Sequence, residues 1–310
     1  MKVTVIGAGL SGLVAARTIA DAGHNVVVLE KGRSSGGRCA TRRIGSAVLD
    51  HGAQFFTVRS EEFTNIVNGW KREGVAREWC RGFGSGDGHV RFCGTAGMTS
   101  IAKHLATGLD VRYLKMVFEI DRLDDGWRVR LDDGSHLDCD RVVVTCPIPQ
   151  SMALIVNTEL EVPDAIRTIE YDKTIAALVV VEGSTNVPEP GGIQNPDSTF
   201  SFIADNLRKG VSSVGALTFH CTPEFSETHW WQAPTETHDR VMELAHRWIG
   251  TARIIEHQPK RWRMATPRTT WHEQCWSAGG LTLAGDAFAG PRIEGAVLSG
   301  LAAARSVLDS

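Results

Sequence analysis

The chain has 310 residues, of which 42% are hydrophobic and 22% charged, a composition typical of a globular protein. The formal net charge of -3, without a dense basic run, excludes an electrostatic basis for binding nucleic acid or an anionic membrane. No stretch of eighteen uncharged apolar residues occurs, so no membrane span is expected. The seven cysteines are scattered, without a CxxC pair or a zinc-ligand cluster, which predicts reduced thiols, no metal site and a cytoplasmic protein.

The first thirty residues predict a strand, a helix and a second strand, over residues 2–6, 10–22 and 25–30. The turn after the first strand reads Gly7-Ala8-Gly9-Leu10-Ser11-Gly12, a GxGxxG pattern. Its first glycine permits a tight turn, the second lets the backbone approach a pyrophosphate, and the third lets helix and strand pack closely. Glu30 ends the second strand, where a carboxylate can accept hydrogen bonds from an adenosine ribose. The pattern therefore predicts a dinucleotide site.

Further along, the chain changes character twice. A loop rich in glycine and arginine is expected over residues 31–43, helices over 61–74 and 99–106, and strands over 117–120, 127–131 and 141–145. Strands over 175–181, 199–203 and 214–219, separated by Pro/Gly-rich loops, and a helix over 238–249 follow. A strand over 281–284 and a helix over 295–308 then resemble the first segment of the chain, in which an apolar strand precedes a helix. We predict an α/β fold with a discontinuous Rossmann-type domain (1–60, 95–150 and 275–310) and an inserted α+β substrate domain built on an antiparallel sheet (61–94 and 151–274).

The C-terminal segment decides between possible dinucleotides. NAD alone would satisfy the glycine pattern. However, the strand at 281–284 ends in Gly285-Asp286, and Gly295-Ala296 opens a helix soon afterwards. An aspartate there can bond a ribityl hydroxyl, and the helix N-terminus can place its dipole near the pyrophosphate or the flavin ring. The two ends of the chain together favour FAD.

These motifs resemble the flavin-containing amine oxidase superfamily and, within it, the bacterial renalase group. The resemblance spans nearly the whole chain, and its most specific parts are Gly52-Ala53-Gln54-Phe55-Phe56-Thr57 and Glu294-Gly295-Ala296 with Ser299-Gly300. It implies a p-hydroxybenzoate-hydroxylase-like fold with non-covalent FAD. In this family Glu30 would hold the ribose, Arg38 the pyrophosphate, the Val117 backbone the adenine and Asp286 the ribityl chain. The full set of implied cofactor residues is Gly7, Gly9, Leu10, Ser11, Gly12, Glu30, Lys31, Gly37, Arg38, Gly52, Ala53, Gln54, Phe55, Val117, Thr145, Pro147, Gly285, Asp286, Glu294, Gly295 and Ala296.

The resemblance also implies a chemistry. Renalases oxidise dihydronicotinamide isomers of NAD(P), and oxygen then reoxidises the flavin to give hydrogen peroxide. Hydride transfer needs a donor held close in a dry cleft but no general base, and no Ser/His/Asp or Cys/His constellation stands out. Phe55, Trp262 and Arg292 are candidates to face the flavin, although an aromatic cluster is often core, and Arg292 could equally pair with Glu294. The catalytic residues stay open.

Two alternatives remain at this point. A true amine oxidase is disfavoured because the chain has only two tyrosines, Tyr113 and Tyr171, neither of them in the C-terminal stretch expected near the flavin. The other alternative is a flavin-binding redox module without turnover. The sequence departs from the renalase pattern at Lys260, where the family often has His, and at Ala287, where bacterial renalases tend to have Trp. Both positions bear on the substrate, a small molecule whose identity and acceptor the sequence leaves open, as it does the oligomeric state.

Overall fold

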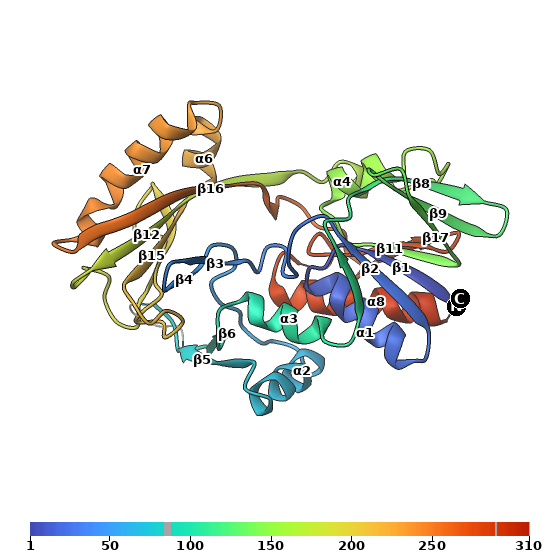
Figure 1. Cartoon of the computed structure of the whole chain (residues 1–310), viewed down its shortest axis with the longest axis horizontal. Coiled ribbons are helices and arrows are strands. Elements are labelled where there is room, and N and C mark those ends of the chain that lie inside the picture. Colours follow the sequence, from blue (N-terminus) through green and yellow to red (C-terminus); the bar gives the residue numbers. More distant parts are fainter. Residues whose placement is uncertain (84–87, 289, 310) are drawn as a thin grey trace.

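A computed structural model describes residues 1–83, 88–288 and 290–309. Its central sheet has six strands in the order β17-β18-β11-β1-β2-β7, with every neighbouring pair parallel except β17 and β18 (Figure 1). The strands are β1 (Lys2–Ile6), β2 (Asn25–Glu30), β7 (Asp110–Tyr113), β11 (Arg141–Val144), β17 (Trp276–Ala278) and β18 (Leu281–Leu283). Both ends of the chain therefore build one sheet, as the motifs at the two ends predict.

Each face of this sheet is covered, because successive strand residues point to opposite sides. Val3, Val5 and Val143 pack with one set of helices, α1 (Leu10–Asp21), α3 (Thr99–Ala106) and α8 (Ile293–Leu308). Val142 and Val144 pack against a small antiparallel sheet with the order β10-β9-β8. That sheet consists of β8 (Val117–Leu123), β9 (Gly126–Leu131) and β10 (His136–Cys139), and α4 (Ile148–Leu154) lies beside it. The short strands are continuous apolar runs because both faces are buried.

A second large sheet is antiparallel and has the order β13-β14-β15-β12-β16. Its strands are β12 (Tyr171–Glu182), β13 (Gly192–Gln194), β14 (Phe200–Asp205), β15 (Ala216–Cys221) and β16 (Arg253–Pro267). The helix α7 (Pro234–Ile249) packs Val241, Ala245 and Ile249 into the core on one face. The shorter helix α5 (Asp164–Arg167) precedes β12, and α6 (Pro223–His229) lies between β15 and α7 in the chain.

The other face of the antiparallel sheet meets a hairpin of β3 (Thr41–Ile44) and β4 (Ala47–Asp50). Ile44, Ala47 and Leu49 pack there against Leu178 and Ala216. A second hairpin, β5 (Ala76–Cys80) with β6 (Arg91–Gly94), follows α2 (Glu61–Arg72), which Ser60 caps through its side chain. The β3–β4 hairpin thus joins the segment after the glycine fingerprint to the second sheet.

Most elements lie where the periodicity predicts them, but three differences have physical reasons. The expected loop over residues 31–43 ends inside β3. Both hairpins are absent from the sequence prediction because their strands have only four or five residues, too few for a clear periodicity. The fifteen-residue strand β16 also has no sequence signal. It is an edge strand, so it tolerates Pro259 and many charges, and these obscure the alternation.

Two further features bear on the class of protein. None of the helices in the described part of the chain has the length and apolar character needed to cross a membrane. None of the seven cysteines forms a disulfide within the part of the chain that the structure describes. The predicted division into an FAD-binding domain (1–60, 95–150 and 275–310) and a substrate domain (61–94 and 151–274) stays a proposal.

Candidate active site

The carboxyl ends of four parallel strands meet at one edge of the central sheet. Gly7 follows β1, Glu30 ends β2, Thr145 follows β11 and Gly285 follows β18. The chain leaves β1 toward β2 on one side, while β11 lies on the other side. Such a point, where the strand order reverses, is where α/β sheets bind dinucleotides.

The glycine fingerprint shows which of its positions serve packing and which leave space. A Cβ on Gly12 would lie 2.0 Å from the Gly7 carbonyl oxygen, and one on Gly7 would lie 2.7 Å from Thr145 Oγ1. A Cβ on Gly9 would meet nothing within 4 Å, and one on Gly37 only Gly9 Cα at 3.4 Å. Packing within the protein therefore explains Gly7 and Gly12, whereas Gly9 and Gly37 border open space.

That open space lies at the N-terminus of α1, which begins at Leu10. Gly9 precedes the helix without a side-chain cap, and no acidic residue occupies the first turn. The first amides of a helix, here those of Leu10, Ser11 and Gly12, have no partner within it, and the helix dipole makes this end positive. The Ser11 hydroxyl is also buried without a hydrogen-bond partner. The arrangement suits a diphosphate.

Glu30 anchors the adjacent end of the site. Its carboxylate accepts hydrogen bonds from the amides of Ala8 (2.8 Å) and Gly32 (2.6 Å). The Lys31 ammonium donates to the Gln150 side chain, three residues after Pro147, which precedes α4. The amide of Lys115 donates to the Glu30 carbonyl, which brings the start of β8 and Val117 to this end. The residues expected around ribose and adenine therefore gather together.

Arg38 and Asp286 form a bidentate ion pair although 248 residues separate them. Two guanidinium nitrogens lie 2.6 Å from the two carboxylate oxygens, and Arg38 also donates to the Ala265 carbonyl. The guanidinium lies over the Tyr171 ring, 5.6 Å from its centre. Burial acts to lower the pKa of Arg38, but Asp286 and Tyr171 together outweigh it, so that pKa is raised above its ordinary value. The predicted pyrophosphate and ribityl residues thus lie at one place.

The helix α8 opens beside Gly285, whose amide donates to Ser299. The Glu294 carboxylate is buried and accepts hydrogen bonds from the Ser60 amide (2.7 Å), the Ser60 hydroxyl (2.6 Å) and the Arg59 amide (3.1 Å). It therefore fixes the start of α2, so this carboxylate is not available to a ligand. The Ala296 amide donates to the Arg292 carbonyl, which leaves the amides of Glu294 and Gly295 in the first turn of α8. Arg292 is exposed immediately before the helix, and the alternative ion pair with Glu294 does not form.

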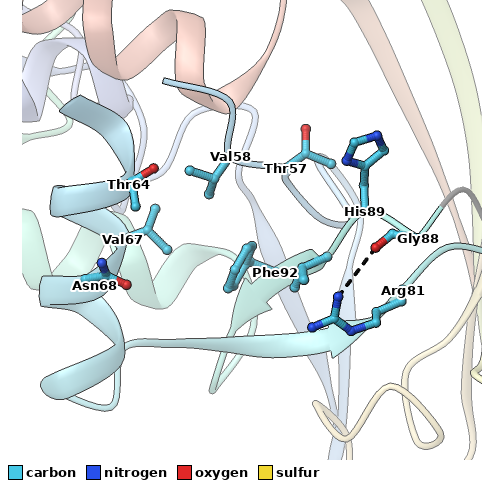
Figure 2. Close-up of a pocket in the computed structure, with 10 residues that line it drawn as sticks. Thr57, Val58, Thr64, Val67, Asn68, Arg81, Gly88, His89 and Phe92 are labelled. Atoms are coloured by element: carbon cyan, nitrogen blue, oxygen red, sulfur yellow. Dashed lines mark hydrogen bonds between the residues drawn. The ribbon is translucent and has the colours of Figure 1, made fainter. Parts of the chain in front are cut away.

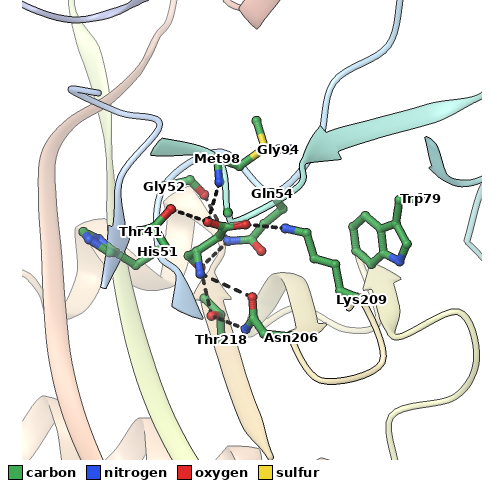
Figure 3. Close-up of polar contacts among 12 residues, drawn as sticks. Thr41, His51, Gly52, Gln54, Trp79, Gly94, Met98, Asn206, Lys209 and Thr218 are labelled. Carbon is green, nitrogen blue, oxygen red and sulfur yellow. Dashed lines mark hydrogen bonds and ion pairs between the residues drawn. The ribbon is translucent and has the colours of Figure 1, made fainter. Parts of the chain in front are cut away.

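A buried polar network holds the segment after β4 (Figure 3). The Asp50 carboxylate lies 2.7 Å from the Lys209 ammonium, and both side chains are fully buried. Its other oxygen accepts from the Thr41 hydroxyl at 2.6 Å and the Met98 amide at 2.8 Å. Because a buried charge is costly unless it is paired and hydrogen-bonded, this network fixes where β4 ends. Sequence reasoning missed Lys209, which lies in a turn after β14 with no motif around it.

The segment after Asp50 runs next to Arg38. Gly52 has no room for a side chain, since a Cβ would lie 1.9 Å from the Arg38 carbonyl oxygen. The Ala53 amide donates to that same oxygen, and the Gln54 amide group donates to the Asp50 and Gly52 carbonyls. Gly52 and Ala53 are partly exposed. The segment is therefore rigid and borders the cofactor edge.

Phe55 lies at the far end of this segment in a cluster of aromatic rings. The ring centroids of Trp79, Phe83 and Phe202 lie 5.2 to 6.4 Å from that of Phe55. The Arg91 guanidinium lies 5.5 Å from the Phe55 ring centre. Phe55 is thus largely a packing residue here.

One face of the antiparallel sheet lies against the same segment. Cross-strand pairing places Phe202, His220, Ala176 and Lys260 in one row. The carbonyl of His51 accepts from His220 Nε2 at 3.1 Å and from Trp262 Nε1 at 2.7 Å. We call this surface the substrate face: the row from Phe202 to Lys260 together with Trp262.

His51 is buried in a cationic setting. Its ring stacks on Trp262 at 5.3 Å and 20°, and the Lys260 ammonium lies 4.8 Å from the Trp262 ring centre. Burial lowers the pKa of His51 to about 4, and the charges of Lys260, His220 and Arg42 act in the same direction. Burial likewise lowers the pKa of His220 to about 4. Both imidazoles are therefore neutral near pH 7.

A cavity of about 400 Å³ lies elsewhere, between α2 and the β5–β6 hairpin (Figure 2). Val67 and Asn68 of α2 line one side, and Arg81, His89 and Phe92 line the other. None of the residues expected to hold the cofactor lines it. It is not the cofactor site.

Comparison with known proteins agrees with this geometry. A model of flavin-containing amine oxidoreductases matches residues 69–308, and an NAD(P)-binding Rossmann-like domain matches residues 5–70. The chain belongs to the flavin-containing amine oxidoreductase family. It is an FAD-dependent oxidoreductase, and the open space beside Gly9, the uncapped α1 and the Arg38–Asp286 pair fit that cofactor.

Individual relatives point in the same direction. Mouse (Mus musculus) renalase is 26% identical over 233 residues, which cover 68% of each chain. Putrescine oxidase of Kocuria rosea is 39% identical over 66 residues, 21% of this chain and 14% of that one. Among solved structures, cyclohexylamine oxidase from Brevibacterium oxydans has a TM-score of 0.78 at 14% identity, with 99% of this chain and 98% of that one covered. The chain is a renalase-like member of the family with the shared fold.

Proposed function

We propose that this family member oxidises a dihydronicotinamide isomer of NAD(P), as renalases do, with oxygen as the electron acceptor and FAD bound without a covalent link. The coarse activity, flavin-dependent oxidation of a small molecule, follows from the family. The finer proposal is carried by the charge of the substrate face. A nucleotide substrate bears phosphate groups, whereas an amine substrate bears a positive charge.

The charges around the substrate face favour the nucleotide. Lys260 and Arg42 act on His51 as positive charges, and the acid that acts on it, Asp50, is paired with Lys209. A protonated amine would meet repulsion here, since like charges at short range in a partly buried site are unfavourable. An anionic group would be attracted. This is the single observation that carries the proposal.

The tyrosines support the same choice. Tyr171 lies beneath the Arg38 guanidinium, and the Tyr113 hydroxyl bonds to Ser35 near the cofactor edge. Neither ring is free to enclose an amine. The pair of aromatic faces that brackets an amine in many amine oxidases therefore has no tyrosine counterpart among the described residues.

When bound, FAD would supply the hydride acceptor and pass the electrons to oxygen. The protein residues have positional tasks. The amides at the start of α1, with Arg38, would hold the pyrophosphate. Glu30 would hold the adenosine ribose, and Asp286 would hold the ribityl chain. The rigid segment over Gly52–Gln54 would orient the flavin ring toward the substrate face. Neutral His51 and Trp262 would exclude water from that side, and no side chain needs to remove a proton.

Anaerobic mixing tests the proposal directly. Purified holoenzyme is mixed with 6-dihydro-NAD, with NADH and with a panel of amines, while the flavin absorption band is followed. We expect rapid bleaching by 6-dihydro-NAD and hydrogen peroxide formation when oxygen is admitted. Bleaching by an amine instead would identify an amine oxidase. Bleaching by dithionite alone would identify a redox module without turnover, and either outcome would contradict the proposal.

A further inference from the structure

We propose that Arg42 and Lys260 form an anion subsite that binds a phosphate group of the substrate at the rim of the substrate face. The inference rests on the proposed function and specifies the substrate as a phosphorylated nucleotide rather than a free nucleoside. It draws on two strands, β3 and β16, that sequence reasoning did not detect.

Strand register places both side chains on facing surfaces. Arg42 pairs with Leu49 across the β3–β4 hairpin, so the two side chains share a face. Leu49 is buried against Leu178 of the antiparallel sheet, so Arg42 also faces that sheet. Lys260 pairs with Ala176, two residues from Leu178 and on the same face. Arg42 therefore approaches from one side and Lys260 from the other.

The His51 imidazole lies near the charges of both Lys260 and Arg42. The charges of Lys260 and Arg42 each contribute to the lowered pKa of the His51 imidazole. The same ring stacks on Trp262, and the Lys260 ammonium lies 4.8 Å from the Trp262 ring centre. The Trp262 ring is partly exposed and lies between the buried His51 ring and the Lys260 ammonium, a surface that suits a ligand with a planar base and a phosphate.

Neither cation has a carboxylate partner among the residues that the structure describes. Lys209 is paired with Asp50, and Arg38 with Asp286, whereas no ion pair forms at Arg42 or Lys260. Both cations act on the same imidazole, and the acid that also acts on it, Asp50, is paired with Lys209. Like charges in a partly shielded site repel, and an anion between them would relieve that repulsion. Arg42 is exposed and Lys260 partly buried, so a ligand can reach both.

The chemical class follows from the donors. A guanidinium binds phosphate oxygens through paired N–H groups, and an ammonium acts as a point charge beside them. The free phosphate or pyrophosphate ester of a nucleotide offers acceptors for both. A neutral nucleoside offers none, so the subsite would distinguish nucleotides from nucleosides.

The test compares two substrates in matched variants of the holoenzyme. Lys260→Gln and Arg42→Gln remove the proposed contacts, while Arg263→Gln and Arg43→Gln remove exposed neighbours on the same two strands. The quantity measured is the ratio of kcat/KM for 6-dihydronicotinamide mononucleotide to that for its riboside. We expect this ratio to fall about tenfold in each subsite variant, mostly through KM, and to stay within about twofold in the controls.

Equal losses for mononucleotide and riboside would overturn the subsite while leaving the proposed function in place. Binding gives a second readout that does not need turnover: NAD and inorganic pyrophosphate are titrated into each oxidised holoenzyme by calorimetry. Weaker binding of both in Lys260→Gln and Arg42→Gln than in the controls supports the subsite even if no dihydronicotinamide bleaches the flavin. Unchanged binding in all four variants would overturn it.

Discussion

The cofactor edge and the substrate face of this enzyme are built from different materials. The cofactor edge consists mainly of backbone amides, glycines and strand ends. Backbone oxygens or the Thr145 side chain leave no room for a Cβ at Gly7, Gly12 and Gly52. At the substrate face, side chains from β14, β15, β12 and β16 stand in a row and meet the segment after β4. The cofactor edge therefore depends on local chain geometry, whereas the substrate face depends on the register between strands that are distant in the sequence.

The largest effect is expected at Gly12 of the glycine fingerprint, with Gly9 as its neighbour in open space. We expect Gly12→Ala to lower the free energy of unfolding by about 5 kcal/mol or more. The new Cβ would lie 2.0 Å from the Gly7 carbonyl oxygen, which cannot shift without distorting the backbone. Gly9→Ala is its matched control. Gly9 has an extended backbone (φ -76°, ψ 177°) and open space around it, so the fold should persist while FAD affinity falls. Thermal unfolding and the flavin content after purification measure the two effects. Equal stability losses would show that Gly9 serves packing instead.

The next largest effect is expected at the buried pair that joins the two regions. Lys209→Met should lower the free energy of unfolding by about 3–5 kcal/mol, because the buried Asp50 carboxyl group would lose its ion-pair partner. The double variant Lys209→Met with Asp50→Asn should recover part of that loss. Urea unfolding followed by circular dichroism measures both. A single variant as stable as the parent would mean that other donors suffice for Asp50.

Acid should weaken the substrate face through His51. Its pKa is lowered to about 4 in the folded protein, while an unfolded histidine titrates near 6.5. The unfolded state therefore binds its proton first as the pH falls, so the stabilisation is complete above about pH 6.5 and lost toward pH 4. We expect a loss on the order of 1–3 kcal/mol from this group. His51→Phe keeps a ring against Trp262 but cannot titrate, and its urea midpoint should fall less between pH 7 and 5. Parallel curves for the two proteins would contradict this.

The smallest expected effect separates two ion pairs of similar geometry. Asp286→Asn removes the charge that holds Arg38 at the cofactor edge, and we expect the Kd for FAD to rise about tenfold. Asp138→Asn removes the partner of Arg128 in an exposed bidentate pair on the β9–β10 hairpin. That change should leave both FAD binding and stability unaltered. Flavin fluorescence titration of the apoprotein measures the Kd, and an equal rise in both variants would remove the distinction.

Sequence reasoning reached the cofactor edge because its signals are short-range. The β-branched run before Gly7, the glycine spacing and Glu30 all fall within one βαβ unit, and Gly285-Asp286 ends a strand in the same way. Each signal records a local backbone requirement. The expected roles of these residues toward FAD stay predictions, but their meeting at one edge is confirmed by the strand order.

The substrate face was largely invisible to the same reasoning. Trp262 was a candidate to face the flavin, yet β16 had no strand signal, since an edge strand need not alternate. Lys209 reads as one charge in a polar turn, and nothing in its neighbourhood announces that it is fully buried against Asp50. Phe55 and Arg292 were also candidates, and the structure places the first in an aromatic cluster and the second at the surface.

The sequence by itself therefore determined the class of fold, the family and the cofactor, because glycines, a strand-end acid and apolar periodicity act over a few residues. Only the tertiary structure decided which charged side chains lie around the substrate face. Asp50 is buried in an ion pair with Lys209, so its negative charge is compensated there. Strand register brings Arg42 and Lys260 near the same imidazole, that of His51. The net charge of a site comes from residues that are far apart in the chain, and the fold determines which of them lie close to it.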